Sequence, residues 1–406
     1  MQNKTNNITK MKMLLGLTTI AAVCMTAPVR GGTSNPPPGG GSGGGLPYAT
    51  ASNVSQLIAD INYANSVGGA ITFSLAPGVT FDLTSANNTT NGGNGLPVIG
   101  ATKAVALTII GNGDTIERIA VIKHNTVKNP FRLFDVAPGA SLTLDQVILK
   151  GGYVSGSGGA ILNQGTLNVI NGSTLSGYAA ANGGAGGGIY NAGGTVTATD
   201  STLSGTYNTG TITVNDSTLY STYNSGTMTV NGSTLSGNTY AGGGIFNAGA
   251  MTLSNSIVSG SSGFYCYYGG GIYNSGSAAT MTISVSTVSG NGARFGGGIY
   301  NDGGAITIKD STVNDNSTYH YDYPWAGGYG GGIYNSAGTV VLDHSIVTGN
   351  TADPGLEDPS IGGGGIFNDS QGTVTVENDS HITANVYDNV TNLGTLHVYD
   401  TSTIDP

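Results

Sequence analysis

A short segment of the form Gly-Gly-x-Ile-Tyr-Asn recurs along the chain from residue 158 to its end. Each copy is followed by a turn, by Gly-Thr-x-Thr-x, and by Asn-Ser-Thr-x-Ser-Gly-Asn. Repetition at a short period is typical of a solenoid, in which each unit packs only on its neighbours. The asparagines that mark the copies are Asn163, Asn191, Asn208, Asn224, Asn247, Asn274, Asn301, Asn335, Asn368 and Asn392.

The tightest copy, residues 208–224, has room for three short strands joined by two-residue turns. Longer copies keep three strands and add residues between Ser-Gly-Asn and the next Gly-Gly-Gly. A stacked coil tolerates insertions at one corner, because loops can leave there without disturbing the rungs. We therefore predict an all-β fold, a right-handed parallel β-helix, with long loops on one corner.

Strand alternation assigns the interior of this coil. In Asp-Ser-Thr-Leu-Tyr, residues 216–220, the small Ser217 and the aliphatic Leu219 share the inner side. In Gly-Thr-x-Thr-x the middle residue points inward and the threonines point outward. An inward Ile in Ile-Tyr-Asn implies an inward asparagine ladder, whose amides satisfy one another at about 4.8 Å per rung.

The same parity predicts an outward row of aromatic rings. An exposed aromatic column is costly, and the alternative is a bulge at the asparagine that turns the rings inward. The residues concerned are Tyr190, Tyr207, Tyr223, Phe246, Tyr273, Tyr300, Tyr334 and Phe367.

The N-terminal part differs from the repeats. Residues 1–27 resemble an export signal, with lysines ahead of an apolar run that is too short to span a membrane. Residues 28–47 are a Gly/Pro-rich linker, 48–157 an N-terminal cap with the first irregular coils, and 158–406 the regular repeats. An alternative for the signal is lipidation at Cys24, although Val23 fits that motif poorly.

One helix is predicted to cover the open N-terminal end of the stack. Asn53 with Gln56 resembles a capping box, and Gly68 suits the end of the helix. The apolar residues at helical spacing are Val54, Leu57, Ile58 and Ile61. Strands are predicted at residues 70–74, 106–110, 131–136 and 141–149.

The stretch FRLFDVAPGASLTLDQVILKGG, residues 131–152, and GGAILNQGTLNVINGSTLSG, residues 158–177, resemble exported bacterial right-handed β-helix repeat proteins. The GGAI and GGGI segments also resemble the polymorphic outer-membrane protein family, whose passengers are surface-exposed adhesins. That family's Phe-x-x-Asn tetrapeptide is absent, and no autotransporter barrel follows Pro406. The resemblance implies the fold and export, and we do not expect this chain to insert into a membrane.

The insertion corner carries the residues best suited to binding. Loops 261–268 and 315–329 leave from the same edge two rungs apart, with Arg294 on the rung between. Their aromatic side chains form a candidate platform for sugar rings, with Asp322 and Arg294 as polar contacts. The alternative is that the loops bury their own rings. The aromatic residues are Phe264, Tyr265, Tyr267, Tyr268, Tyr319, Tyr321, Tyr323 and Trp325.

Catalytic chemistry has weaker support. A polysaccharide lyase needs Ca²⁺ and an Arg or Lys base, and a hydrolase needs clustered carboxylates. Asp353, Glu357 and Asp358 are the candidate Ca²⁺ ligands, but their spacing matches no ligand loop. Lys309 with Asp310 is interpreted as a surface pair. We assign no catalytic residue and expect no cofactor.

The outward threonines form a second regular feature. They stand in pairs about 6.7 Å apart along the strand and about 4.8 Å between rungs, similar to the Thr-x-Thr surfaces of ice-binding solenoids. Threonine is also a good exposed strand residue, which is the simpler explanation. The pairs are Thr195/Thr197, Thr211/Thr213, Thr227/Thr229, Thr280/Thr282 and Thr373/Thr375, with Ala250, Ala305 and Val341 interrupting the array.

These observations rank three functions. The first is a non-catalytic binding or adhesion module for a polysaccharide, a cell-surface glycan or another surface. The second is an extracellular polysaccharide lyase or glycoside hydrolase, and the third is ice binding. We expect the protein to be secreted or associated with the bacterial cell surface or outer membrane. A net charge of −10 disfavours nucleic acid as a partner.

Overall fold

The computed structural model describes most of the chain outside its N-terminus. The described residues are 45–120, 122–123, 126–154, 156–177, 186–237, 243–262, 266–319, 327–353 and 362–405. The expected export signal, Cys24 and residues 28–44 of the expected linker lie outside these ranges.

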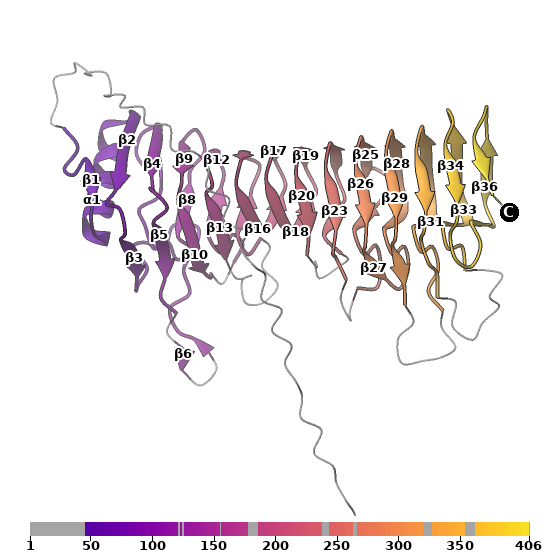
Figure 1. Cartoon of the computed structure of the whole chain (residues 1–406). Coiled ribbons are helices and arrows are strands. Elements are labelled where there is room, and N and C mark those ends of the chain that lie inside the picture. The colour runs from indigo at the N-terminus through magenta and orange to yellow at the C-terminus, as the bar shows by residue number, and fades with distance from the viewer. Residues whose placement is uncertain are drawn as a thin grey trace, which may run out of the picture. The chain divides into compact units, whose positions relative to one another are not determined.

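Nearly all described strands belong to one 33-stranded sheet wound into a stack of coils (Figure 1). Equivalent residues of successive repeats lie side by side: Ile245 pairs with Ile272, and Asn247 with Asn274. Every pairing in this sheet is parallel, as the register of these neighbours illustrates. The predicted parallel β-helix is therefore confirmed.

Each coil has three outer surfaces, which we call faces 1, 2 and 3 in chain order. Face 1 consists of β8 (Phe134–Val136), β11 (Ile161–Asn163), β14 (Ile189–Asn191), β21 (Ile245–Asn247), β24 (Ile272–Ser275) and β35 (Val390–Asn392). Of these, β14, β21 and β24 carry the Ile-aromatic-Asn segment. Face 2 consists of β2 (Gly69–Leu75), β4 (Val105–Ile110), β9 (Ser141–Asp145), β12 (Thr166–Ile170), β15 (Thr195–Thr199), β17 (Thr211–Asn215), β19 (Thr227–Asn231), β22 (Ala250–Ser254), β25 (Thr280–Ser284) and β36 (Thr395–Val398). Of these, β15, β17, β19 and β25 carry the Thr-x-Thr segment. Face 3 carries β3 (Thr80–Leu83), β5 (Thr115–Arg118), β10 (Ile148–Gly152), β13 (Thr174–Gly177), β20 (Thr234–Ser236), β23 (Ile257–Ser259), β26 (Thr287–Ser289), β29 (Thr312–Asn314), β32 (Ile346–Thr348), β34 (His381–Thr383) and β37 (Thr403–Ile404).

Some strands run across a corner. In the two tightest coils, β16 (Thr202–Asn208) and β18 (Thr218–Asn224) join face 3 to face 1, bending where Gly205 and Ser221 take a left-handed φ of 70° and 56°. Three others join face 1 to face 2: β28 (Ile299–Lys309), β31 (Ile333–Asp343) and β33 (Ile366–Glu377). Residues 208–224 were predicted to form three short strands. They contain β17 and the longer, bent strand β18.

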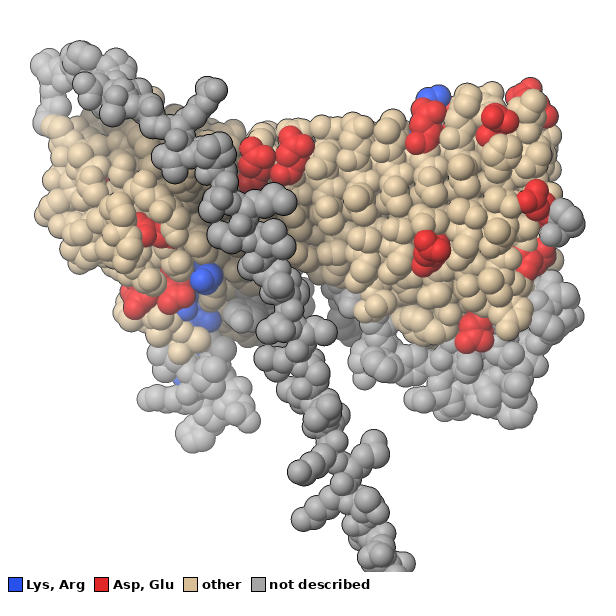
Figure 2. Space-filling view, viewed as in Figure 1, with Lys and Arg blue, Asp and Glu red and all other residues tan. Residues whose placement is uncertain are grey.

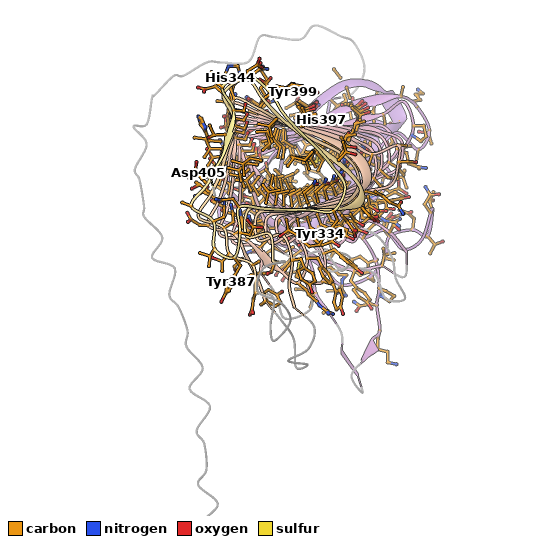
Figure 3. The ribbon with its side chains drawn as sticks, turned by 90° about the vertical axis from the view of Figure 1, so that its right-hand side faces the viewer. Tyr334, His344, Tyr387, His397, Tyr399 and Asp405 are labelled. Atoms are coloured by element: carbon orange, nitrogen blue, oxygen red, sulfur yellow. The ribbon has the colours of Figure 1, made fainter. Side chains whose placement is uncertain are left out.

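The interior follows the predicted alternation. On face 1, Ile272 and Asn274 are 0% exposed, whereas Tyr273 between them is half-buried on the outside. On face 2 the middle residue is buried, as Met228 illustrates, and on face 3 Ser217 and Leu219 point inward. Figure 3, a view of the stack turned by 90°, shows side chains filling the interior and Tyr334 outside the ribbon.

The marker asparagines form an uninterrupted ladder from Asn163 to Asn392. Each Nδ2 donates to the Oδ1 of the asparagine one coil further on, at 2.7–2.9 Å. Most of these amides also donate to backbone carbonyls at the following turn; Asn247, for example, donates to Gly249 and Thr280. The predicted inward ladder is confirmed, and it satisfies groups that would be costly to bury alone.

Two further ladders were not predicted. The inward serines of face 3 accept a hydrogen bond from the backbone N–H of the preceding rung's serine, at 3.0–3.1 Å, from Ser217 to Ser402. At the corner after face 3, Asn291 donates to Asn316, Asn316 to Asn350 and Asn350 to Asn385. The asparagine two residues after each of the face 3 strands β26, β29, β32 and β34 therefore belongs to a second column of amides.

The Gly-Gly-Gly that precedes face 1 in several coils has a steric cause. Gly296 has a φ of 64°, in the left-handed region that favours glycine. A Cβ on Gly297 would lie 2.4 Å from the Ser317 oxygen and 2.5 Å from the Gly331 oxygen, because the backbones of three segments meet there. The triplet is thus a packing requirement of the stack.

The N-terminal end is covered as expected. Helix α1 (Val54–Val67) begins at Asn53, whose side chain accepts from the Gln56 N–H at 3.0 Å, and ends at Gly68. Leu57 and Ile61 are fully buried against the first coils. Within the described chain α1 is too short to cross a membrane.

The predicted N-terminal strands were partly right. Strands β2, β4 and β8 match three of them, but residues 141–149 form two strands, because Gln146 takes a left-handed φ of 55° and turns the chain between faces. Strands β1 (Thr50–Ala51), β3 and β5 were not predicted, nor was the antiparallel pair β6 (Ile122–Lys123) and β7 (Thr126–Val127). Strand pairing is continuous across residue 157, where β8 pairs with β11.

The long insertions leave between faces 3 and 1, at the corner predicted for them. Their described flanks continue the stack: β27 (Gly292–Ala293) pairs in parallel with β30 (Ser317–Thr318). Isolated parallel bridges extend this order from Ser262 to Gly292 and from Ser317 to Thr351. We call this edge the insertion corner.

Candidate functional site

Face 1 carries an outward column of aromatic rings next to the insertion corner. Successive ring centroids are 4.2–5.4 Å apart from Tyr190 to Phe367. The rings of Tyr207, Tyr223 and Phe246 are stacked nearly parallel, at 6° and 8°. The rings therefore point outward, as the strand alternation predicted. The stacked rings contact one another through their flat faces.

A second aromatic column covers part of the first. It consists of Tyr268, Phe295 and Tyr329, whose centroids are 5.9 and 6.0 Å apart. Tyr268 lies 4.7 Å from Tyr300 of the first column. Likewise, Phe295 lies 5.6 Å from Tyr334, and Tyr329 5.2 Å from Phe367. This cover leaves Tyr300 only 8% exposed and removes the cost of a bare aromatic surface.

Phe295 and Tyr329 were missed as members of the site. Each directly precedes the glycine triplet of its coil, as Tyr268 does, so the signal was an aromatic residue before Gly-Gly-Gly in three successive coils. The left-handed glycine that follows each ring turns the chain and places the ring over face 1.

Carboxylates border the first column. The Tyr273 hydroxyl donates to Asp302 at 3.2 Å, and the Tyr334 hydroxyl to Asp369 at 3.1 Å. Burial is the main cause that raises the pKa of Tyr300 to about 12, and it also raises the pKa of Tyr273 and of Tyr334. These hydroxyls therefore stay protonated and act as donors at ordinary pH.

The raised tyrosine pKa values predict alkaline instability. A group whose pKa is higher in the folded state stabilises the fold below its unfolded pKa, here 10, and loses that effect as pH rises toward about 12. The double variant Tyr300→Phe/Tyr334→Phe should unfold at higher pH than the parent, since phenylalanine already occupies this column at Phe246 and Phe367. Circular dichroism and absorbance at alkaline pH measure unfolding and tyrosine ionisation together.

The matched control is Tyr220→Phe, on the exposed side of face 3, which should leave the alkaline midpoint unchanged. Ionisation of the column tyrosines near pH 10 with the fold intact would contradict the explanation by burial.

Tyr267 and Arg294 form the surface of the insertion corner. Tyr267 is 47% exposed. The Arg294 guanidinium carbon lies 4.9 Å from the Tyr267 ring centroid and 5.0 Å from that of Phe295, and its Nη1 donates to the Tyr267 hydroxyl. Its Nε is buried and has no hydrogen-bond partner among the described residues. A cation and an accessible ring are thus held side by side.

The structure brings together those predicted site residues that it describes. Tyr267 and Tyr268 are 5.4 Å apart, Phe295 N–H donates to the Tyr267 carbonyl, and the Tyr319 hydroxyl donates to the Cys266 carbonyl at 3.3 Å. Arg294 lies on the rung between the loops, as predicted. The others lie outside the described residues: Phe264, Tyr265, Tyr321, Asp322, Tyr323 and Trp325.

The candidate metal site is described in part. The Asp353 N–H donates to the Thr318 hydroxyl at 2.7 Å and the Asp353 carbonyl accepts from Gly328, whereas Glu357 and Asp358 lie outside the described residues. Within the described ranges no group of three His, Cys, Asp or Glu side chains is placed to hold a metal ion. Burial raises the pKa of the Cys266 thiol to about 11, which makes it a poor nucleophile.

The threonine array lies on face 2 with the predicted register. Thr195, Thr211 and Thr227 follow one another in one column, and Thr197, Thr213 and Thr229 in the next. Ala250 and Ala305 interrupt the first column and Val341 the second. Lys309 donates to Asp343 at 2.6 Å, a surface ion pair on a neighbouring rung rather than a pair with Asp310. Figure 2 shows one side of the stack, most of which carries no charged side chain.

A comparison with family models finds the same fold class. Residues 207–381 match the family model for a right-handed β-helix region. The A-module of a mannuronan C-5 epimerase from Azotobacter vinelandii is similar over 88% of this chain and 97% of that module, at 13% identity and a TM-score of 0.40. No curated protein matches the chain.

Proposed function

Because the chain is a right-handed parallel β-helix with an aromatic and cationic insertion corner, we propose that it is a non-catalytic binding module for an extracellular glycan. The observation that carries the proposal is the Tyr267–Arg294 pair, a ring that is 47% exposed beside a guanidinium whose carbon lies 4.9 Å from the ring centroid. Aromatic rings pack on the apolar faces of sugars, and guanidinium groups donate to their hydroxyls or carboxylates.

The scaffold supports binding by preorganisation. Backbone hydrogen bonds between rungs fix the corner, including Arg294 N–H to Cys266 O at 3.1 Å and Tyr319 N–H to Ala293 O at 3.1 Å. A ligand therefore need not order the backbone beneath Tyr267 and Arg294. The rings of the two aromatic columns pack on one another, and we assign them a structural role. The binding surface we propose therefore consists of Tyr267, Arg294 and the predicted loop residues Tyr321, Tyr323 and Trp325.

Export of the protein and its location outside the cell belong to the same proposal, and they rest on the N-terminal sequence and the linker. The resemblance to surface-exposed adhesin repeats supports a role at a cell surface.

A glycan array with the full chain tests the proposal. Tyr267→Ala and Arg294→Gln should each weaken binding by about tenfold or more, and Tyr321→Ala/Tyr323→Ala/Trp325→Ala should abolish it without lowering the melting temperature. The matched control is Tyr220→Ala, a similarly exposed tyrosine at 42% on face 3. Binding that is unchanged in all three variants would reject this surface.

Activity assays on the same full chain distinguish this proposal from an enzyme and from an ice-binding protein. Release of reducing ends or of unsaturated products from a bound polysaccharide, with or without Ca²⁺, would replace the binding module with an enzyme. Thermal hysteresis that is lost in Thr213→Tyr would assign the function to face 2 instead.

A further inference from the structure

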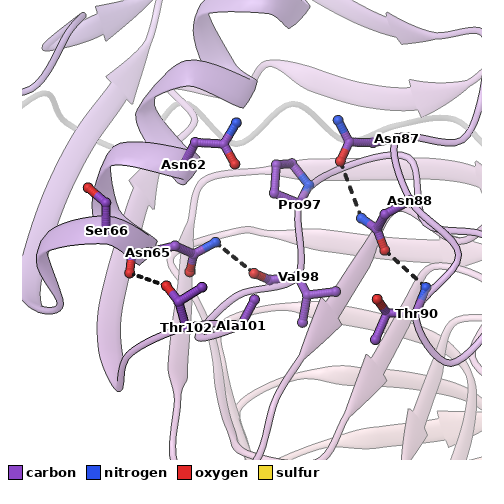
Figure 4. A pocket seen from close by; sticks show the side chains of 10 residues that line it. All are labelled: Asn62, Asn65, Ser66, Asn87, Asn88, Thr90, Pro97, Val98, Ala101 and Thr102. Carbon is purple, nitrogen blue, oxygen red and sulfur yellow. Dashed lines mark hydrogen bonds between the residues drawn. The ribbon is translucent and has the colours of Figure 1, made fainter.

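A pocket of about 360 Å³ lies in the N-terminal cap, between α1 and the segment that follows β3 (Figure 4). None of its lining residues is charged. The lining consists of Asn62, Asn65, Ser66, Asn87, Asn88, Thr90, Pro97, Val98, Ala101 and Thr102.

Two buried or half-buried asparagines fix the shape of this pocket. Asn65 donates to the Val98 carbonyl at 2.8 Å and accepts from the Gly100 N–H at 2.8 Å. Asn88 donates to the Leu96 carbonyl at 3.0 Å and accepts from Asn94 at 2.7 Å. Each amide is bonded through both its nitrogen and its oxygen, so their role is to hold the walls.

The segment after β3 that forms one wall of the pocket is also held by hydrogen bonds from Arg132. Arg132, which is 1% exposed, donates to Asn94 Oδ1 at 2.8 Å and to the Asn91 carbonyl at 2.9 Å. It lies 4.0 Å from Asp135, whose pKa is raised by burial. This buried pair ties the segment to the first coils, and the pocket is therefore preformed.

The rim, by contrast, has free polar groups. Among the described residues the Asn62 side chain has no hydrogen-bond partner, and Asn87 uses only its oxygen, which accepts from Asn88 at 3.3 Å. Figure 4 shows Asn62 on one side of Pro97 and Asn87 on the other. Pro97 and Val98 are buried and provide an apolar floor between these amides.

We propose that this pocket binds a single neutral sugar residue, independently of the insertion corner. Amides offer both donors and acceptors, which suits hydroxyl groups that do both. The apolar floor suits the C–H face of a pyranose, and a volume of about 360 Å³ accommodates one such ring. The lining has no cation to pair with a carboxylate, and the chain's net charge of −10 repels anions, so an ionised sugar is disfavoured.

The probes are glucose, galactose, mannose and N-acetylglucosamine, with glucuronate as the anionic counterpart. Saturation-transfer NMR on the full chain should show a neutral sugar bound with a Kd of about 1–10 mM, at least about tenfold tighter than glucuronate. Asn62→Ala/Asn87→Ala should weaken that binding by about tenfold or more, and Ala101→Phe, which fills the pocket mouth, should abolish it.

Each variant needs an unchanged melting temperature, and the exposed positions of Asn62, Asn87 and Ala101 favour that result. Tyr267→Ala is the matched control: it should leave monosaccharide binding intact while it weakens binding at the insertion corner. No saturation transfer to any neutral sugar, equal binding of glucuronate, or binding that survives both pocket variants would overturn the inference. Oligosaccharides that bind where monosaccharides do not would place the ligand elsewhere and overturn it as well.

Discussion

Replacing Asn247 with alanine is expected to lower the free energy of unfolding by about 3–5 kcal/mol. Asn247 is fully buried in the middle of the ladder, where it accepts from Asn224 and donates to Asn274, both at 2.8 Å. It also donates to Gly249 and Thr280, so the truncation removes several bonds and leaves buried groups without partners. Denaturant unfolding, followed by circular dichroism, measures the loss.

Asn392→Ala is the matched control for this ladder. Asn392 accepts from Asn368 as Asn247 accepts from Asn224, but it lies exposed on the last rung, where water can replace the lost partner. Its truncation should cost less than about 1 kcal/mol. Equal losses at both positions would mean that the ladder contributes little beyond side-chain volume.

Gly297→Ala is expected to be more damaging than its single methyl group suggests, with a loss of about 3 kcal/mol or more. The new Cβ would lie 2.4 and 2.5 Å from backbone oxygens of Ser317 and Gly331, and neither can rotate away. The rungs must separate locally, which breaks hydrogen bonds such as Gly297 N–H to Gly330 O at 3.0 Å. Thermal unfolding and hydrogen exchange at this corner measure the effect.

Gly290→Ala separates the clash from ordinary backbone strain. Gly290 has a φ of 63° but open space where its Cβ would lie, so its cost is the left-handed penalty alone, about 1 kcal/mol. A Gly297→Ala variant as stable as Gly290→Ala would mean that the rungs can shift at little cost, and that the triplet has another origin.

The repeat predicted the coil because its information is local. Whether Ile272 and Asn274 share a side follows from strand geometry alone, and stacking then follows from the identity of successive copies. The serine ladder and the Asn291 column were missed because an inward polar residue does not reveal its partner. The hydrogen-bond partner lies one coil away, and it depends on how the strands of adjacent coils are aligned. The sequence does not give this alignment directly.

The site was predicted in position more than in detail. The sequence placed Arg294 between Tyr267 and Tyr319 because loops inserted at one corner must leave from one edge. It did not show that Phe295 and Tyr329 cover the outward ring column, since that cover depends on tertiary packing across three coils. The N-terminal pocket had no sequence signature, because its walls are asparagines of an irregular segment.

All amides of the long ladder are oriented alike, with nitrogen toward the later coil. The row is therefore a line of aligned side-chain dipoles with distinct ends: the Asn163 oxygen has no partner among the described residues, and Asn392 ends the row at the last rung. Duplicating or deleting a whole coil preserves this alignment. Turning one amide around would place its oxygen against a neighbouring oxygen and its nitrogen against a neighbouring nitrogen. A molecule built this way can change its length in steps of one rung without redesign of its interior.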